Sequence, residues 1–139
     1  MNPPVDPRVA ALLRRVAKAL EGIRYVVGGG VAVVAHGYLR HTSDVDVFAL
    51  ESARPKVLAA LRAAGLHIVP IMDPSMYAAW PSDATADDIE VHVDILFTPI
   101  DIEMWAVRHP VRVVLWGADV PVMRPVVLAA IKFLTGEER

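Results

Sequence analysis

The sequence contains no cysteine and few aromatic residues among its 139 positions. Without cysteine, disulfide bonds and thiolate chemistry are both excluded, which fits a cytoplasmic protein. Aromatic residues make up 6% of the chain, whereas hydrophobic residues make up 55%. The core must therefore consist mainly of aliphatic side chains. That hydrophobic share, together with 22% charged residues, is typical of a chain that folds rather than of a disordered one.

The sequence also lacks an excess of charge of one sign, because its formal net charge is −2. A wide basic surface for nucleic acid is therefore not indicated, and we expect no DNA partner. The cations of the first helix, such as Arg14 and Lys18, are interpreted as a solvated face, with a patch for RNA or a partner protein as the alternative.

Long apolar runs are absent as well. None reaches the roughly 20 residues that cross a bilayer, and the N-terminus does not resemble a signal peptide. We expect a soluble, cytoplasmic protein with no membrane partner.

Alternating helical and extended patterns predict an α/β fold, with a mixed β-sheet flanked by helices in one small domain, residues 1–139. The predicted helices cover residues 7–20, 31–36, 55–64, 101–107 and 125–134, the last one stopped by Gly136. The predicted strands cover residues 24–27, 44–50, 66–71, 90–97 and 111–115. Residues 73–88 show no clear period, so they are predicted to form a long irregular loop or a poorly formed hairpin.

Two aspartates, Asp44 and Asp46, alternate with valines in the strand predicted at 44–50. Successive side chains of a strand point to opposite faces, so both carboxylates share one face while Val45 and Val47 enter the core. Their Cα atoms would lie roughly 6.6 Å apart. This spacing lets both carboxylates converge on one cation, and carboxylate oxygens are the ligands that Mg²⁺ and Mn²⁺ prefer. Taken alone, the pattern also fits an ordinary strand edge or turn.

A second polar face occurs in the strand predicted at 90–97. Glu90, His92 and Asp94 share this face, and aliphatic residues occupy the other. A lone carboxylate buried in such a strand would be costly, so Asp94 is expected to have a partner or a metal. The alternative is an edge strand whose polar face is wet, and this reading is favoured for Glu90 and His92.

Three consecutive glycines, Gly28 to Gly30, separate the first predicted strand from the second predicted helix. Glycine lets the backbone approach a phosphate closely, and the helix start supplies unpaired N–H groups. A simple tight turn explains the cluster equally well. The spacing matches neither the dinucleotide-binding fingerprint nor a Walker loop.

These features together resemble the signature of the DNA polymerase beta-like nucleotidyltransferase superfamily, and in particular the branch of the AbiEii-type toxins and their small relatives. The resemblance rests on the run from Tyr25 to Ala32, followed by Gly37, Arg40, Thr42 and Asp44-Val45-Asp46. It spans residues 25–48, with Asp94 as the third carboxylate on a later strand. The segment 127–134 resembles the helix of that branch with an inward-facing lysine, here Lys132, for which a surface lysine is the alternative.

The resemblance implies a metal-dependent enzyme that transfers a nucleotidyl group from an NTP to a hydroxyl acceptor. Two Mg²⁺ or Mn²⁺ ions would be held by Asp44, Asp46 and Asp94, with Asp94 on the ion that favours deprotonation of the acceptor. The residues implied to bind the nucleotide are Gly29, Gly30, Arg40, Thr42 and Lys132. Arg40 would contact either a phosphate or a carboxylate. The acceptor could be tRNA, another RNA, a protein or a small molecule, and a homodimer or a cognate partner of a toxin–antitoxin pair is compatible with the sequence.

Two departures from the family pattern leave other functions open. Val31 stands where many relatives carry a serine or threonine that contacts phosphate, and the sequence stops at Arg139, soon after the lysine helix. A non-catalytic nucleotide-binding or interaction module is the first alternative. A metal-dependent phosphohydrolase that uses His92 with the three aspartates is the second.

Overall fold

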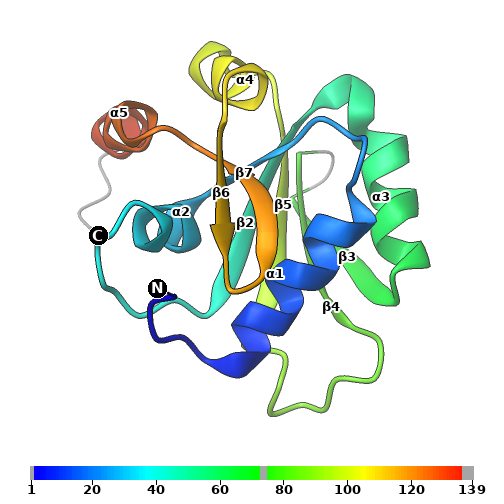
Figure 1. Cartoon of the computed structure of the whole chain (residues 1–139). Helices are drawn as coiled ribbons and strands as arrows, with labels where there is room; N and C mark the ends of the chain where they lie inside the picture. The colour runs from blue at the N-terminus through cyan, green and yellow to red at the C-terminus, as the bar shows by residue number, and fades with distance from the viewer. Residues whose placement is uncertain (1, 73–74, 136–139) are drawn as a thin grey trace.

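The computed structural model describes residues 2–72 and 75–135 of the chain. Figure 1 shows helices packed around a central β-sheet. The helices are α1 (Pro7–Ala19), α2 (Gly29–Ala35), α3 (Arg54–Ala63), α4 (Asp101–Arg108) and α5 (Pro125–Thr135), with a short 3-10 helix η1 (Glu51–Ala53). The strands are β1 (Val26–Gly28), β2 (Asp44–Leu50), β3 (Leu66–Met72), β4 (Met76–Pro81), β5 (His92–Thr98), β6 (Val111–Leu115) and β7 (Ala118–Val122).

The described strands form one seven-stranded sheet in the order β3-β4-β5-β2-β1-β7-β6. The neighbours β2 and β5 run parallel, as do β1 and β7, and the other four neighbouring pairs are antiparallel. The predicted α/β fold with a mixed sheet flanked by helices is therefore confirmed.

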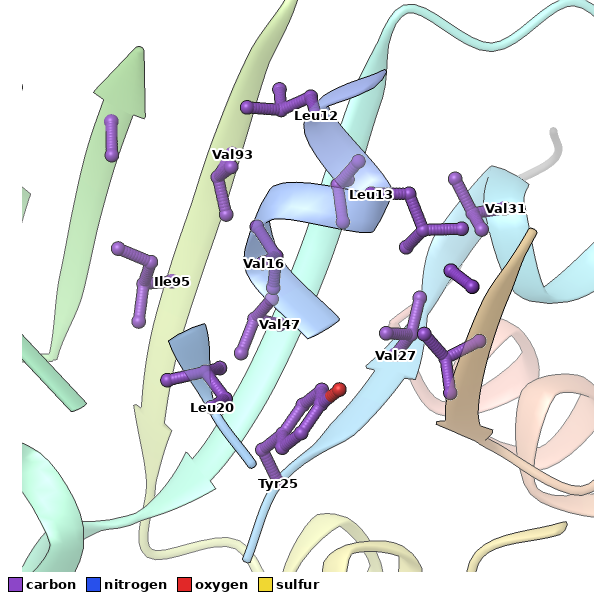
Figure 2. Packing of buried hydrophobic residues seen from close by; sticks show 14 of the residues in the cluster. Leu12, Leu13, Val16, Leu20, Tyr25, Val27, Val31, Val47, Val93 and Ile95 are labelled. Carbon is purple, nitrogen blue, oxygen red and sulfur yellow. The ribbon is translucent and has the colours of Figure 1, made fainter. Parts of the chain in front are cut away.

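One face of the sheet is covered by α1 and α3. The α1 helix starts where the sequence indicates, because the Asp6 side chain caps it by accepting a hydrogen bond from the Arg8 amide at 2.9 Å. Its apolar stripe packs on the valines and isoleucines of β2 and β5, as Figure 2 shows for Val16 beside Val47. Burial of each such side chain stabilises the fold by about 1.5–3 kcal/mol.

A second, smaller core lies between the sheet and the pair α4 and α5. Val26 and Phe48 pack there against Val107 and Val127. Since alternate residues of β2 face opposite sides, Phe48 shares its side with the two aspartates of the same strand. The carboxylates therefore project on the face opposite to α1.

Two strands depart from the prediction. The segment 73–88 contains β4, which pairs with β3 as an antiparallel hairpin and with β5 on its other side. For the described part of this segment the hairpin alternative is the better one, and its irregular stretch follows Pro81. The strand β7 was not predicted.

The predicted helix stop at Gly136 lies outside the described residues. None of the described helices has the length and apolar character that crossing a membrane requires.

Candidate metal and nucleotide site

The three aspartates come from two adjacent parallel strands. Asp46 of β2 lies directly opposite Asp94 of β5, and Asp44 lies opposite His92. Paired residues of neighbouring strands point to the same side of the sheet, so the four polar side chains form one patch on it. Val45 and Val93, which are also paired, project to the other side and are fully buried. The structure therefore brings together the three carboxylates on which the predicted metal site depends.

His92 completes the patch. One ligand atom from each of Asp44, His92 and Asp94 lies within 4.8 Å of the others, which is a suitable spacing for one metal ion. The Nε2 atom of His92 is 3.2 Å from Asp94 Oδ1, and its Nδ1 atom is 3.0 Å from the backbone oxygen of Glu90. A backbone carbonyl on the second ring nitrogen is the usual way in which a ligating histidine is oriented.

Burial and mutual repulsion disturb the ionisation of the carboxylates. Burial, together with the charges of Asp44 and Asp94, raises the pKa of Asp46 to about 7. Burial and the neighbouring Asp94 likewise raise the pKa of Asp44. Burial also acts to raise the pKa of Asp94, but the hydrogen bond and charge of His92 outweigh it and lower that pKa. Asp46 therefore retains its proton at a higher pH than an exposed carboxylate does.

The pKa of His92 moves in the direction that fits this environment. The hydrogen bond to Asp94 raises it to about 9, although burial acts in the opposite direction. In the metal-free protein at neutral pH the imidazole is therefore protonated and acts as the cation of the patch. Metal ligation requires the neutral ring, so binding of an ion through His92 would release a proton.

We expect the metal-free protein to lose stability as the pH rises from 6 to 9. A pKa that is higher in the native state gives stability that is present below the unfolded value and disappears as the pH rises through the native value. For Asp46 the loss extends from 3.8 to about 7, and for His92 from 6.5 to about 9. Urea unfolding with EDTA, followed by tryptophan fluorescence, measures the free energy of unfolding at each pH.

Saturating Mg²⁺ provides the control for this pH dependence. The ion competes with protons for the carboxylates, so the stabilisation that it gives should grow over the same pH range. A metal-free stability that stays constant or rises between pH 6 and 9 would contradict the shifted pKa values of this patch.

The glycine turn lies against the carboxylates. Gly29 has a φ of +58°, and a Cβ atom built on it would lie 1.8 Å from Asp46 Oδ2. Two separate constraints, backbone conformation and space, therefore require glycine at this position. A Cβ atom on Gly30 would lie 2.8 Å from Thr42 Oγ1 and 3.7 Å from Arg40 Nε. The turn thus adjoins both the carboxylate patch and the segment 40–43, which connects to the start of β2.

Two residues of this segment, Thr42 and Arg40, differ in their exposure to solvent. Thr42 is buried and donates a hydrogen bond from Oγ1 to the backbone oxygen of Asp44 at 3.2 Å. Its hydroxyl therefore helps to position the start of β2. Arg40 is exposed, and its side chain lies beside Gly30. Contact of either residue with a nucleotide stays a prediction.

Lys132 and Glu90 are the remaining residues that the sequence singled out. Lys132 is exposed on α5, a helix that packs on α2 and α4, and its contact with phosphates stays a prediction. Glu90 precedes β5 and forms an ion pair with Arg8 at 3.3 Å, so the wet-edge interpretation suits it. The same interpretation was wrong for His92, which is half-buried opposite Asp44. Its place beside the carboxylates depends on the register of two strands that are distant in sequence.

Comparison with known proteins gives matches at the level of structure only. No family model matches the sequence, and no curated protein matches it. The crystal structure of a candidate nucleotidyltransferase from Thermotoga maritima matches with a TM-score of 0.68 and 14% sequence identity, over 96% of this chain and 88% of that one. The AbiEii-type branch stays a prediction.

Two further solved structures that match concern antibiotic resistance. The lincosamide antibiotic adenylyltransferase LnuA, in its lincomycin-bound form, has a TM-score of 0.58 and 13% identity, over 92% of this chain and 86% of that one. The antibiotic-resistance factor ANT(2'')-Ia has a TM-score of 0.68 and 16% identity, over 96% of this chain and 74% of that one. Identities this low establish the fold and not the activity. The chain therefore has the mixed α/β fold found in nucleotidyltransferases.

Proposed function

We propose that this chain is a metal-dependent nucleotidyltransferase, which transfers an NMP group from an NTP to a hydroxyl acceptor. The observation that carries this proposal is the direct pairing of Asp46 with Asp94 beside the Gly29 turn. Carboxylates in this arrangement suit a cation, and glycine backbone in contact with them suits the phosphates that the cation would accompany. The fold shared with adenylyltransferases supports the same reaction class.

A divalent cation fits the residues that are present. Burial and repulsion leave Asp46 with a pKa of about 7, and a cation beside it would remove that repulsion. We propose that Asp44, Asp46 and Asp94 hold Mg²⁺ or Mn²⁺, with His92 as a nitrogen ligand that favours Mn²⁺. When bound, the ion would supply Lewis-acid chemistry, which neutralises phosphate charge and lowers the pKa of the acceptor hydroxyl.

In the proposed reaction the acceptor oxygen forms a bond to the α-phosphorus of the NTP. The bond between that phosphorus and the α–β bridging oxygen breaks, and pyrophosphate leaves with the bonding electrons. The hydroxyl proton passes to solvent, and the negative charge of Asp94 favours its loss. The backbone of Gly29 and Gly30 would contact the outer phosphates, and Arg40, Thr42 and Lys132 are further candidates for binding the nucleotide. Positioning and charge neutralisation supply most of the catalysis in reactions of this type.

The first acceptor to test is a small hydroxylated molecule. Two of the matching structures are described as an antibiotic adenylyltransferase and an antibiotic-resistance factor. The net charge of −2 also disfavours a wide surface for RNA. RNA and protein hydroxyls are the other acceptors of the proposal, and a cell extract presents all three classes together.

The test uses ATP labelled either at the α- or at the γ-phosphate, with Mg²⁺ and a cell extract separated into small molecules, RNA and protein. We expect the α-label to enter one of these fractions, the γ-label to enter none, and pyrophosphate to appear in equal amount. Asp94→Asn should abolish the transfer. Asp87→Asn is the matched control, because Asp87 is an exposed loop carboxylate outside the patch.

Each alternative function gives a different result. Binding of ATP without transfer of label from any of the four NTPs would indicate a non-catalytic nucleotide-binding module. Release of phosphate from a simple ester in the absence of an acceptor, with dependence on His92, would indicate a phosphohydrolase. Transfer that persists in Asp94→Asn would contradict the proposed role of the carboxylates.

A further inference from the structure

An open cavity lies away from the carboxylate patch. It has a volume of about 850 Å³ and is lined by the end of α1 with the turn that follows, by the end of α4, and by the β6–β7 hairpin. Small-molecule sites typically occupy about 300–1,000 Å³. The lining contains none of the residues assigned above to the metal and nucleotide site. Tyr25 lines the cavity directly before β1, whereas the glycine turn ends β1, so roughly 10 Å of strand separates the two places.

The lining is strongly cationic although the whole chain is slightly acidic. Five basic residues line the cavity, two of them from α1, and these are Arg14, Lys18, Arg24, Arg108 and Arg112. Only two acidic residues, Glu21 and Asp119, accompany them. This excess of three positive charges contrasts with the formal net charge of −2 for the protein. Like charges that converge on one cavity repel one another, and an anion bound among them would relieve that repulsion.

Two of the five cations already have partners. Arg112 pairs with Asp119 at 3.1 Å, and Arg14 donates a hydrogen bond to the backbone oxygen of Trp116 at 2.9 Å. For the side chains of Lys18, Arg24 and Arg108, the structure gives no hydrogen bond or ion pair with any residue in the part of the chain that it describes. These three cations therefore have donors available for a ligand, and phosphate oxygens are well suited to accept from them.

The remainder of the lining limits the kind of anion. Apolar and aromatic groups from Leu20, Tyr25, Val107 and Pro121 lie among the cations. Such a mixture suits a compact ligand with an organic part and several phosphates better than an extended nucleic-acid backbone, which requires a basic stripe along the surface. We infer that this cavity is a second binding site, for a nucleotide-sized anion that carries more than one phosphate.

Calorimetric titration of the metal-free protein tests this inference. Inorganic tripolyphosphate and ATP are added separately in low-salt buffer with EDTA, so that the carboxylate patch has no cation to attract phosphate. We expect one anion to bind per chain, with an affinity that falls as salt is added. The double variant Arg24→Gln/Arg108→Gln should bind each probe at least about tenfold more weakly. Asp87→Asn should bind both as the unchanged protein does, because Asp87 is exposed and lies outside the cavity.

The matched control is Lys56→Gln/Arg62→Gln on α3. Both residues are exposed and outside the cavity, and Arg62 lies in the last turn of its helix as Arg108 does in α4. The control therefore removes the same charge and a comparable helix-end cation. Equal weakening in both double variants would overturn the inference, as would the absence of saturable binding. It would also be overturned if an RNA 12-mer bound at the cavity cations while tripolyphosphate and ATP did not.

Discussion

Replacing Asp46 with asparagine is expected to lower nucleotidyl transfer by at least about 10³-fold, because the substitution removes a charge that the proposed metal ligands supply together. The same change should stabilise the metal-free protein. At pH 8 the Asp46 carboxylate, with its pKa of about 7, is ionised among two other acids, whereas asparagine is uncharged. We expect a gain of roughly 1–3 kcal/mol in the free energy of unfolding, measured with urea in EDTA.

This opposite response of activity and stability distinguishes a functional carboxylate from a structural one. Asp87→Asn, on the exposed loop, should change neither quantity. Mg²⁺ should raise the unfolding temperature of the unchanged protein and of Asp87→Asn, and should have little effect on Asp46→Asn. If Asp46→Asn instead destabilised the metal-free protein and left transfer intact, the carboxylate would be a structural residue and not part of a metal site.

The substitution Gly29→Ala should have the largest effect on the shape of the site. Its methyl group would enter a backbone conformation with positive φ and overlap Asp46 Oδ2, which lies 1.8 Å from the position of the new carbon. The strained backbone alone costs about 1–2 kcal/mol, and displacement of the buried carboxylate adds to that cost. We expect a total loss of roughly 2–4 kcal/mol in the free energy of unfolding, and metal binding too weak to detect by calorimetry.

Gly22→Ala separates the two causes of that loss. Gly22 also has a positive φ, of +80°, but a Cβ atom there would meet nothing within 4 Å. This control should lose only about 1 kcal/mol and should bind metal normally. Equal losses in the two variants, with metal binding retained in both, would show that the glycine turn does not lie against Asp46.

The strand β2 could be predicted to its ends because its first four residues alternate between aspartate and buried valine, and three further apolar residues complete it. The strands β4 and β7 could not. The sequence of β4, Met76–Pro81, has two consecutive alanines and no alternation. Its extended conformation depends instead on pairing with β3 on one side and β5 on the other. The strand β7 contains Pro121, which normally argues against a strand. It is tolerated here next to β1, with which only Val122 is in register.

For the candidate site, the sequence predicts which side chains share a face of a strand, but not which strands are neighbours. Alternation alone places Asp44 and Asp46 on one face, and it places His92 and Asp94 on one face of another strand. It does not show that these strands are neighbours, that they run parallel, or that Asp44 meets His92. That knowledge requires the register between segments more than 40 residues apart in the sequence, which depends on packing of the whole sheet. The close approach of Gly29 to Asp46 depends on the same packing.

The register between β2 and β5 also has a consequence for folding. A slip of β5 by one residue would turn Asp94 and His92 towards α1, into the space that Val93 and Ile95 now fill. The mispaired chain would then bury two ionisable groups in an aliphatic core, at a cost of several kcal/mol. The polar residues of this strand therefore destabilise the wrong alignment. A folded chain in which the carboxylates lie together also has β2 and β5 paired in the correct register.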